Sequence, residues 1–298
     1  MKKIKLTYFT PTYNREKLLP NLYNSLLEQT NKNFIWLIID DGSKDGTEQL
    51  VKKWQKENKI QIEYVKKENG GKHTAIELSN QICTTEFIAC IDSDDTLTKD
   101  ATNILYSKFD LCTDNDIAGL LGPKTILNGK VKIDWQTDGE KIYFYDLDKL
   151  FGIIPETTLV FKTDIAKRFH FPAFDDERFV TESVYYKQFF YDYKFITFKD
   201  EVYIAEYQDD GYTNMGMRLF IKNPKGYACC LKQNAYLDIK HKKSFKTKIK
   251  RTMLYYGWKA LFKIKTDIMP ELKFPWFYKF VGVVTIPISK FVLKRRLK

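Results

Sequence analysis

Ile88-Ala89-Cys90-Ile91-Asp92-Ser93-Asp94-Asp95 is the stretch of this 298-residue sequence that decides the fold. Its first four residues form an apolar run that predicts a buried strand of a parallel sheet. The run ends in three carboxylates, which would lie at the carboxyl edge of the sheet, where open α/β sheets bind ligands. Three negative charges this close repel one another without a cation, and such oxygens suit Mg²⁺ or Mn²⁺ together with a bound diphosphate. The alternative is an acidic turn that caps the next helix, with Asp95 or Thr96 as the N-cap.

Before this stretch, strand and helix patterns alternate along the chain. Strands are expected at residues 3–9, 34–39, 60–65 and 87–91. A helical pattern runs to Gln29 with Pro20 in its first turn, and two more helices are expected at 45–57 and 73–82. This alternation predicts an α/β fold, a doubly wound and mainly parallel sheet with right-handed crossovers.

A polar loop follows each of these four strands. The loops are TPTYNR (10–15), DDGS (40–43), NGGK (69–72) and DSDD (92–95). Because the carboxyl ends of parallel strands lie at one edge, we expect the four loops to converge there. The dinucleotide fingerprint and the phosphate-binding P-loop are both absent from the sequence. The pattern therefore predicts a nucleotide site of another kind.

The second half of the chain is less regular. Strands are expected at 118–126, 142–145, 158–162 and within 195–207, and short helices at 146–151, 164–169 and 181–191. No repeat or low-complexity linker interrupts the sequence before residue 215. Residues 1–215 are therefore interpreted as one domain.

The composition is that of a globular protein in a reducing compartment. Hydrophobic residues make up 44% of the chain and aromatic residues 15%, which excludes a disordered chain. The five cysteines are odd in number and form no C-x-x-C pair, so we expect a cytoplasmic protein without a disulfide framework. The apolar run before Pro11 is too short for a signal peptide and is interpreted as the first strand.

Positive charge is concentrated at the C-terminus. The net charge is +11, but residues 240–298 contain 17 basic and 2 acidic residues, a net charge of +15, which leaves −4 for the rest. In residues 240–265 basic and apolar side chains alternate in a helical manner. An apolar stretch over 274–293 is then interrupted by Lys279, Pro287 and Lys290 and is followed by Lys294-Arg295-Arg296.

This C-terminal pattern favours a helix that lies in the interface of an anionic membrane. We therefore expect peripheral attachment to the inner face of the cell membrane. The alternatives are a helical appendage or oligomer interface packed against protein, and a true membrane span. A nucleic-acid partner is not expected, because the basic residues are interleaved with long apolar runs and no nucleic-acid motif is present.

The four motifs together resemble those of the family 2 glycosyltransferases. They occur in the family's order, and a later acidic loop precedes a helix, as in the family. The resemblance covers roughly residues 3–215. It implies the GT-A fold, with a nucleotide-sugar-binding half in 1–97, an acceptor half in 98–215, and a helical, basic C-terminal region in 216–298.

The resemblance implies roles for the first three loops. Asp41 would accept the imino N–H of a uracil-type base, since a carboxylate facing a fixed donor discriminates strongly; the alternative is that Asp41 or Asp40 caps the helix near Asp45. Thr10, Pro11 and Tyr13 would line the base pocket, with packing as the other role for Tyr13. Gly70 and Gly71 would let the backbone approach the nucleotide, and Lys72 would place a cation near the ribose or diphosphate. His73 is either a donor contact or a partly buried structural histidine.

The resemblance also implies a metal site. Asp94 and Asp95 would hold Mn²⁺ or Mg²⁺ against the two phosphates, and Asp92 would contact the ribose or support the site. Asp209 and Asp210 are candidates for further metal or loop contacts.

Inverting members of the family need a carboxylate that deprotonates the acceptor hydroxyl. The family's Glu-Asp pair matches Glu182-Ser183, so Glu182 is predicted as the base although a serine replaces the expected Asp. Asp176 and Glu177 are the runners-up. In the alternative interpretation Thr181 caps a helix and Glu182 is only a first-turn charge.

The sequence thus predicts an inverting, metal-dependent glycosyltransferase of the hexosyltransferase type. It would move a sugar from a nucleotide-sugar, a UDP-sugar, to a hydroxyl of a glycan or lipid-linked acceptor in cell-surface polysaccharide or glycolipid synthesis. The alternatives are a catalytically inactive, membrane-associated scaffold with the same fold, and a nucleotidyltransferase. The oligomeric state is left open.

Overall fold

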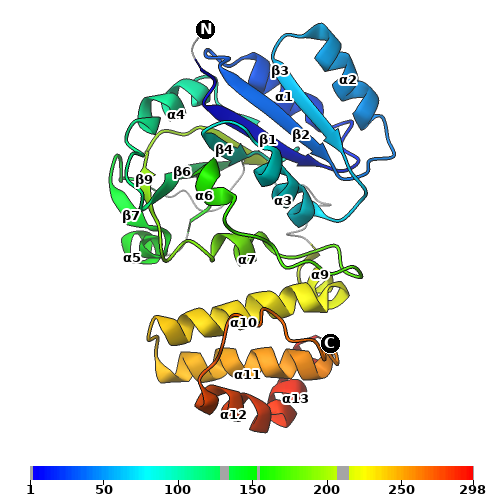
Figure 1. Cartoon of the computed structure of the whole chain (residues 1–298), viewed down its shortest axis with the longest axis vertical. Coiled ribbons are helices and arrows are strands. Elements are labelled where there is room, and N and C mark those ends of the chain that lie inside the picture. Colours follow the sequence, from blue (N-terminus) through cyan, green and yellow to red (C-terminus); the bar gives the residue numbers. More distant parts are fainter. Residues whose placement is uncertain (1–2, 128–133, 153–154, 207–214, 298) are drawn as a thin grey trace. The chain divides into compact units, whose positions relative to one another are not determined.

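The computed structural model describes residues 3–127, 134–152, 155–206 and 215–297. The chain divides into two compact units (Figure 1). The first unit contains residues 1–170 and 188–209, and the second contains 171–187 and 210–298.

The first unit begins with the predicted alternation of strands and helices. Its elements, in chain order, are β1 (Leu6–Thr12), α1 (Leu19–Leu27), β2 (Phe34–Asp40), α2 (Thr47–Glu57), β3 (Gln61–Lys66), α3 (Lys72–Ile82), β4 (Phe87–Cys90), β5 (Thr96–Leu97), α4 (Ala101–Phe109), β6 (Ile117–Leu127), β7 (Lys141–Tyr143), η1 (Phe144–Asp146), α5 (Leu147–Phe151), β8 (Thr157–Lys162), α6 (Thr163–Ala166), β9 (Lys194–Thr197) and β10 (Tyr203–Glu206). Pro20 lies in the first turn of α1, where its missing N–H costs no helical hydrogen bond.

The strands form one mixed, mostly parallel sheet. Strands β3, β2, β1 and β4 are neighbours in that order and run parallel. Strand β8 pairs antiparallel with both β4 and β6, while β6 runs parallel to β9 and β10. This arrangement confirms the predicted mainly parallel sheet.

Alternate residues of the central strands build the core on one face of this sheet. Tyr8 of β1 and Trp36 of β2 belong to a buried cluster to which α1, α2 and α4 contribute side chains such as Trp54 and Phe109. The rings of Tyr23 and Trp54 stack with centroids 4.1 Å apart. Helix α3 contacts β1 and β2 without entering this cluster, and Figure 1 shows it on the other side of the sheet from α1. The sheet is therefore doubly wound.

Some elements differ from the expectations. Strand β1 extends to Thr12, so the first three residues of TPTYNR continue the strand. Pro11 is tolerated there because β4 pairs only with residues 6–9 of β1, which leaves the proline on an open side. The strand β5 and the helix α4 were not predicted, and the helix expected at 181–191 is confined to α7 (Glu182–Tyr186).

The second unit is helical. Besides α7 it contains α9 (Met217–Lys222), α10 (Pro224–Lys240), α11 (Phe245–Leu261), α12 (Trp276–Val284) and α13 (Ile286–Arg296). Val180 and Val184 from the 171–187 segment share a buried cluster with Ala228 of α10 and Trp258 of α11. This segment was expected within the first domain, and its apolar side chains instead pack with the C-terminal helices.

The described helices are short relative to the thickness of a membrane. None of them alone is long and apolar enough to cross a bilayer; α12 and α13 meet the requirement of length and composition only as a pair, bent by 61°.

Candidate functional site

The four polar loops meet at the carboxyl edge of β1, β2, β3 and β4, as predicted. The N–H of Asp41 donates to the carbonyl oxygen of Thr12 (2.8 Å), and the N–H of Asn14 donates to Ser43 Oγ (2.9 Å). Lys72 of the NGGK loop forms an ion pair with Asp92 of the DSDD loop (2.6 Å). These contacts join residues that lie far apart in the sequence into one rim.

Asp41 is the buried acceptor that shapes the glycine loop. One carboxylate oxygen accepts hydrogen bonds from Lys67 Nζ (2.7 Å) and the N–H of Gly70 (2.9 Å), and the other accepts from the N–H of Gly71 (2.7 Å). A carboxylate has about four acceptor positions, so donors from the described residues fill three of them and leave one for a further donor.

Asp40 acts within its own turn and does not cap α2. Its carboxylate accepts from the N–H of Ser43 (2.7 Å) and from the hydroxyl of Tyr64 (2.6 Å). At the start of α2, Asp45 accepts from both the N–H and the hydroxyl of Thr47. The two acidic residues of DDGS therefore shape loops, with Asp40 facing inward and Asp41 facing the glycine loop.

The residues predicted to line a base pocket lie in different environments. Thr10 is fully buried, and its hydroxyl accepts a hydrogen bond from Trp36 Nε1 (3.0 Å). Pro11 is also buried, whereas Tyr13 is 44% exposed. Thr10 thus has a core contact, and Tyr13 presents an aromatic surface at the rim.

The glycine loop brings its backbone close to neighbouring groups. Gly71 has a φ of +92°, a conformation that favours glycine. A Cβ on Gly70 would lie 2.8 Å from Thr74 Oγ1. His73 is buried in the first turn of α3, and burial lowers its pKa to about 4. The histidine is therefore neutral at neutral pH.

Two of the three carboxylates of the DSDD loop are compensated by the protein. Burial acts to raise the pKa of Asp92, but Lys72 and Lys124 outweigh it and lower that pKa. Asp95 accepts from the hydroxyl of Tyr203 (2.7 Å) and the N–H of Glu206 (3.1 Å), and it forms an ion pair with Lys124 (3.3 Å). Asp95 is thus fixed between β6 and β10.

Asp94 is compensated least. Burial, and then the negative charges of Asp92 and Asp95, raise the pKa of its carboxyl, with Arg15 as a weak opposing charge. Within the described residues, the ion pairs of this loop belong to Asp92 and Asp95. An ionised Asp94 therefore favours an additional cation beside it. A divalent metal that keeps waters and takes diphosphate oxygens needs only one or two protein carboxylates, so these residues fit such an ion.

The alternative interpretation of DSDD as a helix cap was wrong. Thr96 lies in β5, which pairs antiparallel with β10. The next helix, α4, begins only at Ala101. The acidic loop therefore leads into a strand.

Two site residues were missed from the sequence, Lys124 and Tyr203. Lys124 lies in β6 with its Nζ 4.2 Å from the centroid of the Tyr203 ring. Burial opposes the charge of Lys124, but Asp92 and Asp95 outweigh this effect and raise its pKa. The Tyr203 hydroxyl accepts the N–H of Asp92 (2.9 Å) and donates to Asp95. Both residues lie in ordinary strand patterns, so no local signal marks them.

The three candidates for the catalytic base belong to the second unit. Glu177 accepts from the N–H groups of Lys225 (2.7 Å) and Gly226 (2.8 Å) in the first turn of α10. Asp176 forms an exposed ion pair with Lys225 Nζ (2.6 Å). Glu182 opens α7 and accepts from the Tyr186 hydroxyl (3.3 Å); Thr181 holds the N-cap position without a side-chain cap bond. Asp176 and Glu177 thus have structural contacts of their own.

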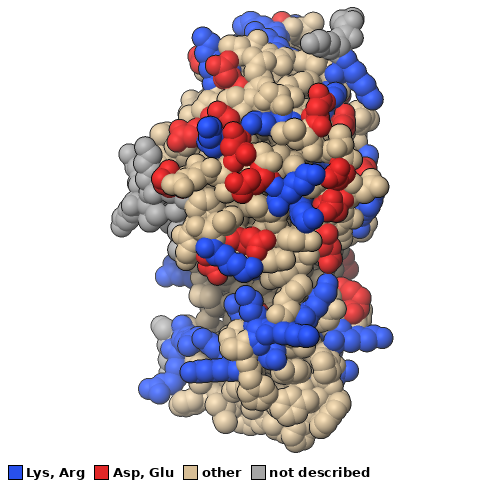
Figure 2. Space-filling model, turned by 90° about the vertical axis from the view of Figure 1, so that its left-hand side faces the viewer, with Lys and Arg blue, Asp and Glu red and all other residues tan. Residues whose placement is uncertain are grey.

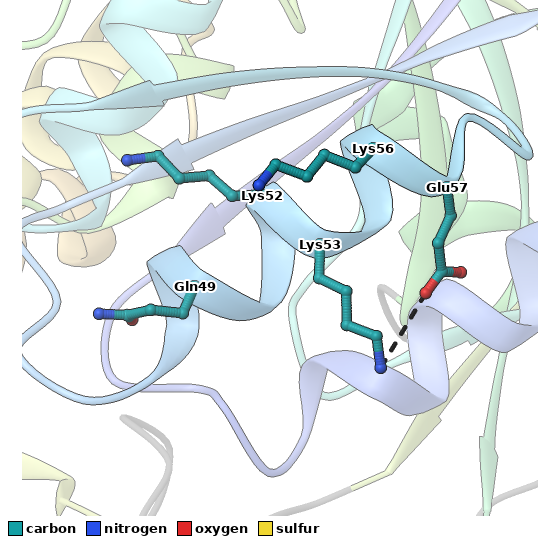
Figure 3. Close-up of a pocket in the computed structure, with 5 residues that line it drawn as sticks. All are labelled: Gln49, Lys52, Lys53, Lys56 and Glu57. Carbon is teal, nitrogen blue, oxygen red and sulfur yellow. Dashed lines mark ion pairs between the residues drawn. The ribbon is translucent and has the colours of Figure 1, made fainter.

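Two further features lie outside the rim. A shallow hollow of about 550 Å³ follows the exposed side of α2, lined by Gln49, Lys52, Lys53, Lys56 and Glu57 (Figure 3). All five residues come from one helix, and none is a predicted site residue. In the part of the chain that the structure describes, no three His, Cys, Asp or Glu side chains form a metal cluster by themselves. Asp209 and Asp210 lie outside the described residues.

The sequence was compared with protein families and with characterised proteins. A family model described as "Glycosyl transferase family 2" matches residues 7–169. Glycosyltransferase GlyA of Streptococcus pneumoniae is 31% identical over 104 residues, which is 35% of this chain and 15% of GlyA. Poly(ribitol-phosphate) beta-N-acetylglucosaminyltransferase TarS of Staphylococcus aureus is 30% identical over 99 residues, which is 33% of this chain and 17% of TarS. The matches thus span less than a fifth of these two relatives.

Solved structures extend the likeness. The crystal structure of S. aureus TarS 1–349 in complex with UDP-GlcNAc matches 98% of this chain and 92% of that chain, with a TM-score of 0.60 at 17% identity. The mannosyltransferase PcManGT from Pyrobaculum calidifontis, in complex with GDP-Man and Mn²⁺, matches 97% of this chain and 86% of that chain, with a TM-score of 0.54 at 16% identity. These structures confirm the predicted GT-A fold.

Proposed function

The chain belongs to glycosyl transferase family 2, and from this premise we propose that it is an enzyme that transfers a sugar from a nucleotide-sugar to a hydroxyl acceptor. The observation that carries the proposal is the rim at the carboxyl edge of the sheet. There a buried acceptor, Asp41, binds the N–H groups of the NGGK loop, and the Lys72–Asp92 ion pair joins that loop to the one that carries the undercompensated carboxylate Asp94. Open α/β sheets bind nucleotides at this edge.

We propose a UDP-sugar as the donor. Asp41 has room for one more donor beside Gly70 and Gly71, and the imino N–H of uracil would take that position. Tyr13 offers an exposed aromatic face for the base. TarS in complex with UDP-GlcNAc supports this choice, whereas PcManGT in complex with GDP-Man is the reason to test other nucleotides.

We propose that Asp94 holds a Mn²⁺ or Mg²⁺ ion at this edge. Such an ion supplies Lewis-acid stabilisation of the charge that develops on the leaving nucleoside diphosphate. Lys72 pairs with Asp92 and Lys124 pairs with Asp95, so these two carboxylates have cationic partners in the protein and shape the loop around Asp94. Asp95 was expected to be a metal ligand as well, and its contacts with Tyr203 and Glu206 favour a supporting role instead.

We propose Glu182 as the base that takes the proton of the acceptor hydroxyl in an inverting transfer. Glu182 is the choice among the three because it takes the place of the Glu in the family's Glu-Asp pair and opens α7. Asp176 and Glu177 bind Lys225 and the N–H groups at the start of α10. The acceptor that we propose is a cell-surface glycan or a lipid-linked precursor of one, because TarS acts on poly(ribitol-phosphate) according to its name.

The first experiment is calorimetric titration of UDP, GDP, dTDP and CDP with Mn²⁺, with Mg²⁺ and with a chelator. The expected result is metal-dependent UDP binding that Asp94→Asn weakens at least tenfold and Asp164→Asn leaves unchanged. Asp164 is a matched control, because its carboxylate is exposed and forms a surface ion pair with Arg168, four residues further along the chain. No binding of any nucleoside diphosphate by the folded protein would sink the transferase proposal and favour an inactive scaffold.

The second experiment tests the base. Glu182→Gln should abolish sugar transfer and hydrolysis of the donor while UDP binding stays as in the wild type, because the amide cannot accept a proton at neutral pH. Glu177→Gln is the comparison. Transfer that survives in Glu182→Gln near the wild-type rate, and is lost in Glu177→Gln with the fold intact, would move the role to Glu177.

A further inference from the structure

The helices α12 and α13 are oriented with their small residues inward. A Cβ on Gly282 of α12 would lie 2.2 Å from the Tyr256 ring of α11, and a Cβ on Gly257 of α11 would lie 2.5 Å from Ser289 Oγ of α13. The two helices therefore lie close against α11 through glycine and serine. A helix on the surface of a water-soluble protein would place its large apolar side chains on the side that faces the protein core.

Leu293 of α13 is buried in the core of this unit, but most of the large apolar side chains of these two helices are exposed. Trp276 is 77% exposed and Phe291 60% exposed, and Phe245 at the start of α11 extends the same surface because its ring lies 6.1 Å from that of Phe277. We call this surface the apolar ridge. Its members are Phe245, Trp276, Phe277, Phe280, Val283, Val284, Ile288 and Phe291. An exposed apolar surface of this extent marks an interaction site.

Cations surround the apolar ridge. Residues 272–298 contain seven basic residues and no acidic one. The Arg295 guanidinium lies 5.5 Å from the centroid of the Phe291 ring, and Lys248 Nζ lies 5.9 Å from that of Tyr278. Within the unit that contains α10 to α13, Figure 2 shows basic side chains gathered in a band beside a surface without charge. The partner must therefore be both apolar and anionic.

We propose that the apolar ridge and its cations dock on the surface of an anionic lipid bilayer. The aromatic and aliphatic side chains would enter the acyl boundary, and the lysines and arginines would contact the headgroups. Helices of 9 and 11 residues are about 14 and 17 Å long, shorter than the roughly 30 Å hydrocarbon core. The 61° bend between them therefore fits helices that lie in the interface.

A second copy of this chain is the competing occupant. In a twofold dimer the same patch faces itself, so Lys294, Arg295 and Arg296 of one copy would approach those of the other. This repulsion disfavours a dimer through the ridge, whereas an anionic lipid surface attracts the same charges.

The test is cosedimentation of the full chain with vesicles of phosphatidylcholine alone or with about one-third phosphatidylglycerol. The expected result is binding to the anionic vesicles only, weakened by high salt. Trp276→Ser/Phe280→Ser/Phe291→Ser should abolish it, and Lys294→Gln/Arg295→Gln/Arg296→Gln should weaken it by about 100-fold, at roughly fivefold per cation.

Matched controls come from the first unit. Lys52→Gln/Lys53→Gln/Lys56→Gln removes the same charge from α2 (Figure 3), and Leu111→Ser/Leu127→Ser/Leu150→Ser removes three apolar side chains that are 45 to 48% exposed. Both should bind vesicles as the wild type does. Circular dichroism and thermal unfolding of every variant report the fold. Calorimetry of UDP separates this proposal from the donor site, since either can fail while the other holds.

Three outcomes would overturn the proposal. The first is no binding of the wild type to anionic vesicles. The second is a dimer in light scattering that only the ridge variant loses. The third is bound protein that resists both high salt and alkaline carbonate, which would indicate a spanning tail.

Discussion

Tyr203 joins two parts of the DSDD loop through one hydroxyl, which accepts the N–H of Asp92 and donates to Asp95. Tyr203→Phe removes the acceptor of the Asp92 N–H and one of the donors to Asp95, so we expect a loss of about 1 to 3 kcal/mol in the free energy of unfolding. We also expect weaker metal-dependent UDP binding, because Asp94 lies between the two released residues. Urea denaturation and calorimetry measure these two effects.

Tyr106 provides the control for this variant. Its hydroxyl donates to the carbonyl oxygen of Asn33 (2.6 Å) and accepts the N–H of Lys5 (2.9 Å), at the amino end of β1. Tyr106→Phe should reduce stability to a similar degree and leave UDP binding unchanged. Wild-type UDP affinity in Tyr203→Phe would show that the hydroxyl does not position the loop.

His73 predicts how stability depends on pH. Burial lowers its pKa from 6.5 to about 4, opposed by the charges of Asp41 and Glu77 and assisted by Lys67. Because a proton then binds His73 more tightly in the unfolded state, the free energy of unfolding depends on this histidine's charge. Its contribution is fully present above pH 6.5, and the free energy of unfolding decreases by about 2 to 3 kcal/mol as the pH falls toward 4. His73→Gln should flatten the decline in the urea midpoint over this range. His170→Gln, at an exposed histidine, should retain it, and equal curves for the wild type and His73→Gln would contradict the assignment.

At the scale of elements, the start of α10 depends on a carboxylate from another segment. Asn223 holds the N-cap position, but its side chain makes no cap bond, and Glu177 binds the N–H groups of Lys225 and Gly226 instead. Glu177→Ala should destabilise the protein by about 1 to 3 kcal/mol, because two buried donors lose their acceptor. Glu177→Gln should recover part of this loss in thermal unfolding.

Asp176→Ala is the matched comparison for that cap. The neighbouring carboxylate is exposed and pairs with the side chain of Lys225, and exposed ion pairs contribute little. A smaller loss in Glu177→Ala than in Asp176→Ala would refute the capping role.

The regular elements could be predicted because each carries its own signal. The strands β1 to β4 are apolar runs that end in polar loops, and this local pattern placed Asp41, Lys72 and Asp92 at one rim. Lys124 and Tyr203 could not be found in this way, since their partners lie 29 and 111 positions away in the sequence. The short strand β5 was missed because two residues carry no periodicity. The acidic loop 174–177 matched a family pattern, but that pattern does not predict the hydrogen bonds that Glu177 accepts from the start of α10.

At the scale of the whole molecule, the two segments of the first unit can be joined into one chain without the second unit. Gln188 Nε2 donates to the carbonyl oxygen of His170 (2.8 Å), so the two ends left by removing residues 171–187 are adjacent. All residues proposed to bind the donor and the metal belong to this unit, whereas Glu182 belongs to the removed segment. A chain of residues 1–170 joined to 188–209 by a short Gly-Ser linker should therefore fold and bind UDP with Mn²⁺ but transfer no sugar.

A simple truncation to residues 1–209 should behave differently from this spliced chain. It retains Val180 and Val184, whose buried partners on α10 and α11 are gone, and it leaves the Val184 carbonyl without the Gln233 side chain (2.9 Å). We expect this truncation to expose apolar surface and to aggregate, while the spliced chain stays monomeric in light scattering. The reverse result would be a monomeric truncation and a spliced chain that aggregates. It would mean that residues 171–187 cover part of the core of the first unit, because removing them would then expose apolar side chains that the truncated chain keeps covered.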